Sequence, residues 1–232
     1  MDAGRAMSDE SIFREVDEAI RQDQLKVLLR KYGLLVLGGA VAIVAGVGGY
    51  KFWNYWTAQQ ASDAGGRFVG AVTLLRDGKN AEAIEVFKSL ADEGPSGYRR
   101  LARFRLAAVY AKDGKIAEAI NIYDKLAADS GLDKIQQGFA VIQAATLRLD
   151  DAPFDEMNKR LKALAVTGNP WRHSARELLG LSAYRAGNRA VAERYFNVML
   201  GDQQTPANMR RRAEMMLSLL VQSTGAPAPA GN

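Results

Sequence analysis

The feature that most constrains this chain is an uncharged, apolar stretch of 19 residues from Tyr32 to Tyr50, bounded by Lys31 and Lys51. As an α-helix rising about 1.5 Å per residue, it would be roughly 28 Å long. That length is close to the hydrocarbon core of a bilayer, which is about 30 Å thick. A buried helix of a soluble protein usually keeps one polar face, but this stretch is apolar on all sides. We therefore expect residues 32–50 to form a single transmembrane helix.

The context of this stretch favours a permanent anchor over a cleaved signal peptide. A secretory signal has a short basic start, an apolar run of about 7–15 residues and a cleavage site of small residues. Here residues 1–31, with acidic and basic side chains mixed, precede a longer run. The chain has no cysteine, so it cannot carry a lipid-anchored cysteine. We expect the helix to stay in the membrane.

The basic residues on its two sides predict its orientation. Five lie between residues 13 and 31, and two lie between residues 51 and 70. Since lysine and arginine gather on the cytoplasmic side, we expect residues 1–31 in the cytoplasm and the rest beyond the membrane. Residues 51–60 form an aromatic interface segment, with Tyr50, Phe52, Trp53, Tyr55 and Trp56 at the far boundary.

One face of the predicted helix carries only small residues. These are Gly38, Ala42, Ala45, Gly46 and Gly49. Small residues at such spacing let two transmembrane helices approach closely, although glycine and alanine are also common in membrane spans. The pattern offers a packing face without saying whether its partner is a second copy or another protein.

A repeat of about 36 residues predicts the fold of the remainder. The sequence DGKNAEAI at residues 77–84 recurs as DGKIAEAI at residues 113–120, and a weaker copy, AGNRAVAE, occupies residues 186–193. Pairs of helices repeating at about this length are typical of tetratricopeptide solenoids. A third unit near Asp151 is degenerate, and we expect Pro153 to replace glycine in its turn.

The expected fold is therefore all-α, with one N-terminal transmembrane helix followed by a tetratricopeptide-type α-solenoid. Residues 1–31 form a cytoplasmic segment with a short amphipathic helix, and residues 61–222 form the repeat domain. Within it, a capping helix covers residues 206–222. Residues 223–232, rich in proline, alanine and glycine, form a disordered tail.

No combination of residues predicts catalysis, a cofactor or a metal site. The one histidine is His173, and without cysteine or a second histidine the usual zinc ligand sets cannot form. We interpret His173 as a surface or hydrogen-bonded structural residue, and the chain as a non-enzyme. The net charge of +5 is too dispersed to indicate nucleic-acid binding.

One cluster of arginines offers a candidate protein-binding site. Arg99, Arg100 and Arg103, with Arg105 nearby, lie on one expected helix. Such a cluster is commonly a solvated face whose aliphatic stems cover apolar surface. The alternative is part of a groove for acidic peptide segments.

The order of features resembles the YfgM family. Lys31-Tyr32-Gly33 enters a span rich in glycine, alanine and valine, Tyr50-Lys51-Phe52-Trp53-Asn54-Tyr55-Trp56 leaves it, and degenerate repeats follow. The resemblance covers nearly the whole chain. The third unit and the tail depart from the family pattern.

The resemblance implies a single-pass inner-membrane protein of a Gram-negative bacterium with its repeats in the periplasm. It implies association with the SecYEG translocon and the membrane-anchored chaperone PpiD, and a non-enzymatic role in passing secreted client proteins to periplasmic chaperones. The alternative function is a membrane-anchored repeat adaptor for envelope assembly or stress signalling.

Overall fold

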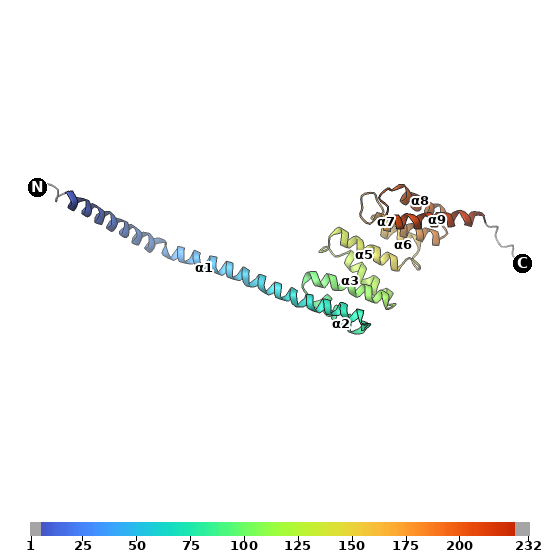
Figure 1. Cartoon of the computed structure of the whole chain (residues 1–232), viewed down its shortest axis with the longest axis horizontal. Coiled ribbons are helices and arrows are strands. Elements are labelled where there is room, and N and C mark those ends of the chain that lie inside the picture. The colour runs from blue at the N-terminus through green and yellow to red at the C-terminus, as the bar shows by residue number, and fades with distance from the viewer. Residues whose placement is uncertain (1–5, 226–232) are drawn as a thin grey trace. The chain divides into compact units, whose positions relative to one another are not determined.

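The computed structural model describes the backbone of residues 6–225 and the side chains of residue 26 and residues 30–222. In that part of the chain the secondary structure is helical and contains no strand (Figure 1). The helices are α1 (Ala6–Arg76), α2 (Asn80–Glu93), α3 (Ser96–Lys112), α4 (Ile116–Ala127), α5 (Lys134–Leu147), α6 (Phe154–Leu161), α7 (Arg172–Arg185), α8 (Arg189–Gly201) and α9 (Ala207–Gly225). The all-α prediction is confirmed.

Helix α1 joins segments that the sequence suggested as separate elements. Residues 6–31 of the N-terminal segment, the span and the aromatic segment lie on one continuous helix that ends at Arg76. The physical reason is the absence of a strong stop signal, since the first proline of the chain is Pro95 and the first turn signal is Asp77-Gly78. The amphipathic face predicted for residues 1–31 falls on side chains outside the described residues.

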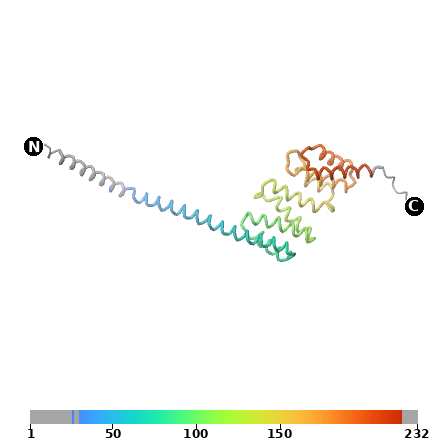
Figure 2. The backbone as a smooth tube through the Cα atoms, viewed as in Figure 1, coloured from blue at the N-terminus to red at the C-terminus, as the bar shows by residue number. Residues whose placement is uncertain are grey.

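The chain divides into two compact units, residues 1–62 and residues 63–232. The first unit contains the apolar stretch. The second contains the final turns of α1 together with α2 to α9, which pack as consecutive neighbours (Figure 2). The domain boundaries proposed from the sequence stay predictions.

In the second compact unit, which contains the repeats, the chain turns at the glycines that the sequence predicted. Gly78, Gly114 and Gly187 have φ angles of 77°, 78° and 73°, which residues with a Cβ atom rarely adopt. Each turn is closed by a backbone bond that returns to the preceding helix, for example from Lys115 N to Tyr110 O at 2.8 Å. The third repeat lacks this turn. Pro153 precedes α6 there, and α6 has only 8 residues.

The core of the repeat unit lies between successive helices. Phe87 of α2 is fully buried against residues of α1 and α3. Farther along, Phe196 of α8 packs where a Cβ atom on Gly180 of α7 would lie only 2.8 Å from its ring. Burying one such aromatic side chain stabilises the fold by about 1.5–3 kcal/mol.

Polar contacts tie each repeat to the next at nearly the sequence period. Arg160 pairs with Asp124, and Trp171 Nε1 donates to Ile135 O at 2.9 Å, both across 36 residues. Arg212 pairs with Glu177 across 35 residues. These contacts set the register of neighbouring repeats independently of their apolar packing.

The C-terminal helix extends beyond the predicted cap. Helix α9 runs to Gly225, so the first three residues of the predicted tail are helical. Residues 226–232, where the rest of that tail was predicted, lie outside the described residues.

Candidate functional site

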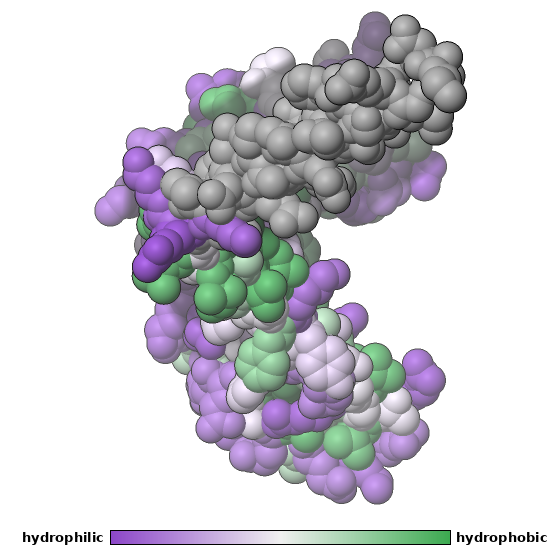
Figure 3. All heavy atoms as spheres, turned by 90° about the vertical axis from the view of Figure 1, so that its left-hand side faces the viewer, coloured by the Kyte–Doolittle hydropathy of each residue, from purple (hydrophilic) through white to green (hydrophobic). Residues whose placement is uncertain are grey.

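The apolar stretch of α1 is largely exposed in the isolated chain. Among the described residues, one helix, within Arg30–Arg76, is long and apolar enough to cross a membrane, and none of its most apolar window is buried. Leu34 is 87% exposed. In the space-filling view of Figure 3, green apolar residues are visible in several places among the purple polar residues. An apolar surface of this extent requires a covering medium or partner.

The small residues of this stretch are open on the outside. A Cβ atom on Gly38, Gly46 or Gly49 would meet nothing within 4 Å. The face that these glycines form with Ala42 and Ala45 is therefore open to a partner helix. Its use stays a prediction.

The aromatic residues after the stretch surround the helix. Tyr50, Phe52, Trp53, Tyr55 and Trp56 are each more than half exposed. With 3.6 residues per turn, their positions fall on several sides of α1, not on one stripe. That distribution suits a membrane–water interface, which contacts a helix from all sides.

The arginines of the predicted cluster on α3 fall into two groups, those that bond to backbone carbonyls and one that does not. Arg99 Nε donates to Gly94 O at 3.2 Å, and Arg100 Nε donates to Ser96 O at 3.1 Å while another of its nitrogens donates to Gly131 O. These two side chains are half-buried and hold backbone carbonyls near helix ends. Arg103 is half-buried as well, but within the described residues no hydrogen bond or ion pair holds it.

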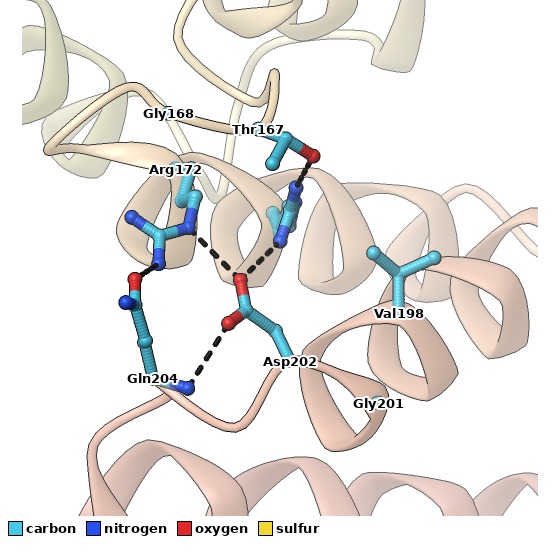
Figure 4. Close-up of a pocket in the computed structure, with 8 residues that line it drawn as sticks. Thr167, Gly168, Arg172, Val198, Gly201, Asp202 and Gln204 are labelled. Carbon is cyan, nitrogen blue, oxygen red and sulfur yellow. Dashed lines mark hydrogen bonds and ion pairs between the residues drawn. The ribbon is translucent and has the colours of Figure 1, made fainter.

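A second group of arginines, on α7, converges on one carboxylate (Figure 4). Arg172 Nε lies 2.9 Å and Arg176 Nη1 3.1 Å from Asp202 Oδ2. Arg176 is only 5% exposed and also donates to Ala165 O at 2.9 Å. The backbone amide of Gln204 donates to the other oxygen of Asp202 at 3.0 Å. Three hydrogen bonds therefore hold the carboxylate.

These contacts change the acidity of Asp202 in a definite direction. The hydrogen bond from Arg172, followed by that from the Gln204 amide, holds the pKa of Asp202 far below its ordinary value. An ionised Asp202 thus joins α7 to the turn between α8 and α9. Beside it lies a shallow cavity of about 540 Å³, whose wall includes Thr167, Val198 and Gln204.

His173 is buried next to this network and is hydrogen-bonded, one of the two roles expected for it. Its Nδ1 lies 3.0 Å from Thr205 Oγ1, and that hydroxyl donates to Met199 O at 2.7 Å. The imidazole therefore donates to the hydroxyl and does not act as its base. Burial, and then the charge of Arg172, lowers the pKa of His173.

The described residues hold no group of three or more histidine, aspartate or glutamate side chains that could bind a metal ion. The network on α7 joins elements of the fold and offers no free nucleophile. Sequence reasoning missed Asp202 because its partners lie 26 and 30 residues away, outside any local motif. No pattern in the sequence pointed to it.

Comparison with known proteins agrees with this architecture. The chain is 24% identical over 189 residues to a protein of Escherichia coli (strain K12) named "Ancillary SecYEG translocon subunit", covering 80% of this chain and 89% of that protein. This similarity supports the resemblance to the YfgM family. No solved structure matches the chain.

The sequence model of one family spans most of both units. It is described as a tetratricopeptide repeat-like domain and matches residues 26–220. The match includes the apolar stretch, the glycine turns and most of the capping helix. The chain belongs to the tetratricopeptide repeat-like domain family.

Proposed function

We propose that this chain is a non-enzymatic scaffold of the Sec translocon, anchored in the inner membrane by one helix. The observation that carries the proposal is the similarity to an ancillary SecYEG translocon subunit along 89% of that relative. In this proposal the repeats lie in the periplasm, a PpiD-type membrane-anchored chaperone is a second partner, and secreted clients pass to periplasmic chaperones.

The division of labour follows from the physics of the two units. Lipid is as apolar as leucine, so a membrane helix selects a partner by close packing and not by hydrophobicity. The face of Gly38, Ala42, Ala45, Gly46 and Gly49 supplies that packing toward the translocon or the chaperone. Client contact falls to α3, where Arg103 is the free member of the predicted trio Arg99, Arg100 and Arg103.

Co-purification tests the proposal. The full chain, tagged at its C-terminus and extracted in mild detergent, should recover the translocon. Gly38→Leu with Gly46→Leu should reduce that recovery, whereas the matched pair Val36→Leu with Val47→Leu, on the opposite side of the helix, should not. Absence of translocon with the unaltered chain rejects the function, and equal recovery by both pairs rejects the packing face.

Orientation has its own test, because the chain contains no cysteine of its own. A cysteine at position 62 should react with a membrane-impermeant maleimide in intact spheroplasts. A cysteine at position 11 should react only after lysis. The reverse pattern places the repeats in the cytoplasm and contradicts the proposal.

A further inference from the structure

Helix α3 is unusual among the helices of the repeat unit for its unbalanced charge. Its 17 residues, SGYRRLARFRLAAVYAK, include four arginines, one lysine and no acidic residue. Arg99 and Arg100 are engaged with backbone carbonyls. Within the described residues Arg103, Arg105 and Lys112 have neither a hydrogen bond nor an ion pair, so their charge is available.

Two of these free cations lie on the outer side of the helix. Leu101, Arg105, Ala108 and Lys112 are all exposed and follow one another at spacings of four, three and four residues. Side chains at such spacings share one helix face. We call this row the α3 stripe. Ala108 lies between the two cations, and Leu101, at one end, is 50% exposed.

A small cavity opens beside the stripe. Its volume is about 190 Å³, and it is lined by Leu75, Asn80, Arg105, Ala108, Val109 and Lys112. A water molecule occupies about 30 Å³ in the liquid, so the cavity has room for a branched apolar side chain. Leu75 and Val109 provide apolar contacts, and the two cations lie among its lining residues. We call this the α3 pocket.

The acidic residue nearest to the stripe in sequence already has a partner. Asp113 Oδ1 accepts a hydrogen bond of 3.0 Å from Asn80 Nδ2. It is exposed and is not among the residues that line the pocket. Its hydrogen bond fixes Asn80, which is a wall of the pocket, and leaves Arg105 and Lys112 without a carboxylate.

We propose that the α3 stripe and pocket bind an extended polypeptide segment in which an apolar side chain is flanked two residues away on each side by a carboxylate. The apolar side chain enters the α3 pocket, and the carboxylates pair with Arg105 and Lys112. The inference rests on the proposed function for its setting, since it names the class of client segment that the scaffold holds.

The spacing of the two cations supports this pattern. Seven residues of helix separate Arg105 from Lys112 by about 10.5 Å along the axis. In an extended segment, residues i, i+2 and i+4 point to the same side, and the outer two are about 13 Å apart. Flexible arginine and lysine side chains cover the remaining difference. Exposed pairs of this kind are weak, so the client is released readily.

Fluorescence anisotropy with the full chain in detergent micelles tests the inference. The probe is the capped peptide Glu-Ser-Leu-Ser-Glu carrying an uncharged fluorophore. It should bind, and binding should weaken as salt increases. Arg105→Glu with Lys112→Glu should weaken binding at least fivefold. Ala108→Phe, which fills the pocket without changing charge, should also weaken it.

The matched controls separate the site from net charge. Arg211→Glu with Lys125→Glu changes the same charges at exposed positions on α9 and α4 and should leave binding unchanged. The peptides Lys-Ser-Leu-Ser-Lys and Glu-Ser-Ser-Ser-Glu should not bind. Far-UV circular dichroism shows whether each variant is folded. Ala108→Phe tests the pocket independently of the charge-reversal variant.

Each remaining outcome overturns the inference. The first is no binding of the Glu-Ser-Leu-Ser-Glu probe up to about 1 mM, the range of weak peptide contacts. The second is that the Arg105→Glu/Lys112→Glu variant binds the probe as well as the unaltered chain does. The third is that the peptide without leucine binds as well as the one with it. The variant should still recover the translocon. Lost peptide binding with intact recovery removes this site only, whereas lost recovery by the unaltered chain removes the proposed function.

Discussion

Helices α3 and α7 are the first helices of the second and fourth repeats, and both are rich in arginine. On α7, Arg172 and Arg176 share the carboxylate of Asp202 and are largely buried. On α3, Arg105 and Lys112 are exposed and unpaired among the described residues. The same residue type therefore joins elements of the fold at one repeat and presents free charge at the other.

The loops that follow explain the difference. After α8, Asp202 accepts from the Gln204 amide through one oxygen and binds the arginines of α7 through the other. After α4, the acidic residues are used locally: Asp129 Oδ1 accepts from Gly131 N at 2.8 Å, and Asp133 Oδ1 accepts from Gln136 N at 2.7 Å as the N-cap of α5. With its acids engaged at helix ends, the second repeat leaves part of the charge of α3 uncompensated. Charge counting along the sequence does not distinguish these two situations.

The largest effect on stability should come from Arg176→Met. The change leaves Ala165 O without its donor and removes one of the two arginines that face Asp202. Breaking a buried ion pair on one side typically costs about 3–5 kcal/mol of unfolding free energy. Urea unfolding of the full chain in micelles, followed by circular dichroism, measures it. A loss below about 1 kcal/mol, the size of an ordinary surface ion pair, would show that the arginines of α7 contribute no more to stability than exposed ones such as those of α3.

Packing substitutions should also affect the stability of α7 more than that of α3, but by a smaller amount. Gly180→Ala on α7 places a Cβ atom 2.8 Å from the ring of Phe196 and should cost about 1–3 kcal/mol by overpacking. Ala108→Leu on α3 enters exposed space and should change stability by less than about 0.5 kcal/mol. Equal losses in urea unfolding would show that the outer face of α3 is packed and not open.

Mild acid should weaken the α7 region before it affects α3. Burial gives His173 a lower pKa in the folded chain than in the unfolded chain, so the unfolded chain takes up a proton first as pH falls. The free energy of unfolding should therefore be constant above about pH 6.5 and decrease below it. A second decrease should follow below about pH 3.8, where Asp202 protonates in the unfolded chain while its lowered pKa keeps it ionised in the folded one.

His173→Asn isolates the first of these steps. The variant should lose the decrease that begins near pH 6.5 and keep the one at lower pH. Hydrogen exchange of α7 and α8 amides as a function of pH measures both. An unchanged profile in the variant would assign the acid sensitivity to another group.

The smallest stability change should come from the α3 stripe. Arg105→Glu with Lys112→Glu removes no hydrogen bond or ion pair made by the described residues, so the unfolding free energy should stay within about 0.5 kcal/mol of the original. The same variant should lose peptide binding. A large loss of stability would mean that these cations, like those of α7, hold the fold together.

Periodicity and turn chemistry made much of this fold predictable. The 36-residue offset predicted the glycine turns at Gly78, Gly114 and Gly187, and Pro153 marked the altered third turn. The continuity of α1 was not predicted, because the sequence was divided where its composition changes from polar to apolar to aromatic. A change in composition does not end a helix. Only a breaker does that, and the first one is Asp77-Gly78.

The candidate sites were less predictable because several of their contacts join segments that are far apart in the sequence. The sequence placed Arg99, Arg100 and Arg103 together, but which of them meet a carbonyl depends on Gly94 and Gly131 in other segments. Likewise, Asp202 meets Arg172 only after α8 has folded back. Such pairings follow from tertiary register, which the period alone specifies to within a few residues.

Site-specific photocrosslinking in membranes tests the account most directly. A photoreactive residue replaces Leu101 on the α3 stripe or, as a match, Val198 beside the arginines of α7; the two positions are 50% and 46% exposed. With a secreted polypeptide arrested in the translocon, the account predicts strong crosslinking to that polypeptide from position 101 and little from position 198. Equal crosslinking from both positions, or crosslinking from position 198 alone, would contradict it.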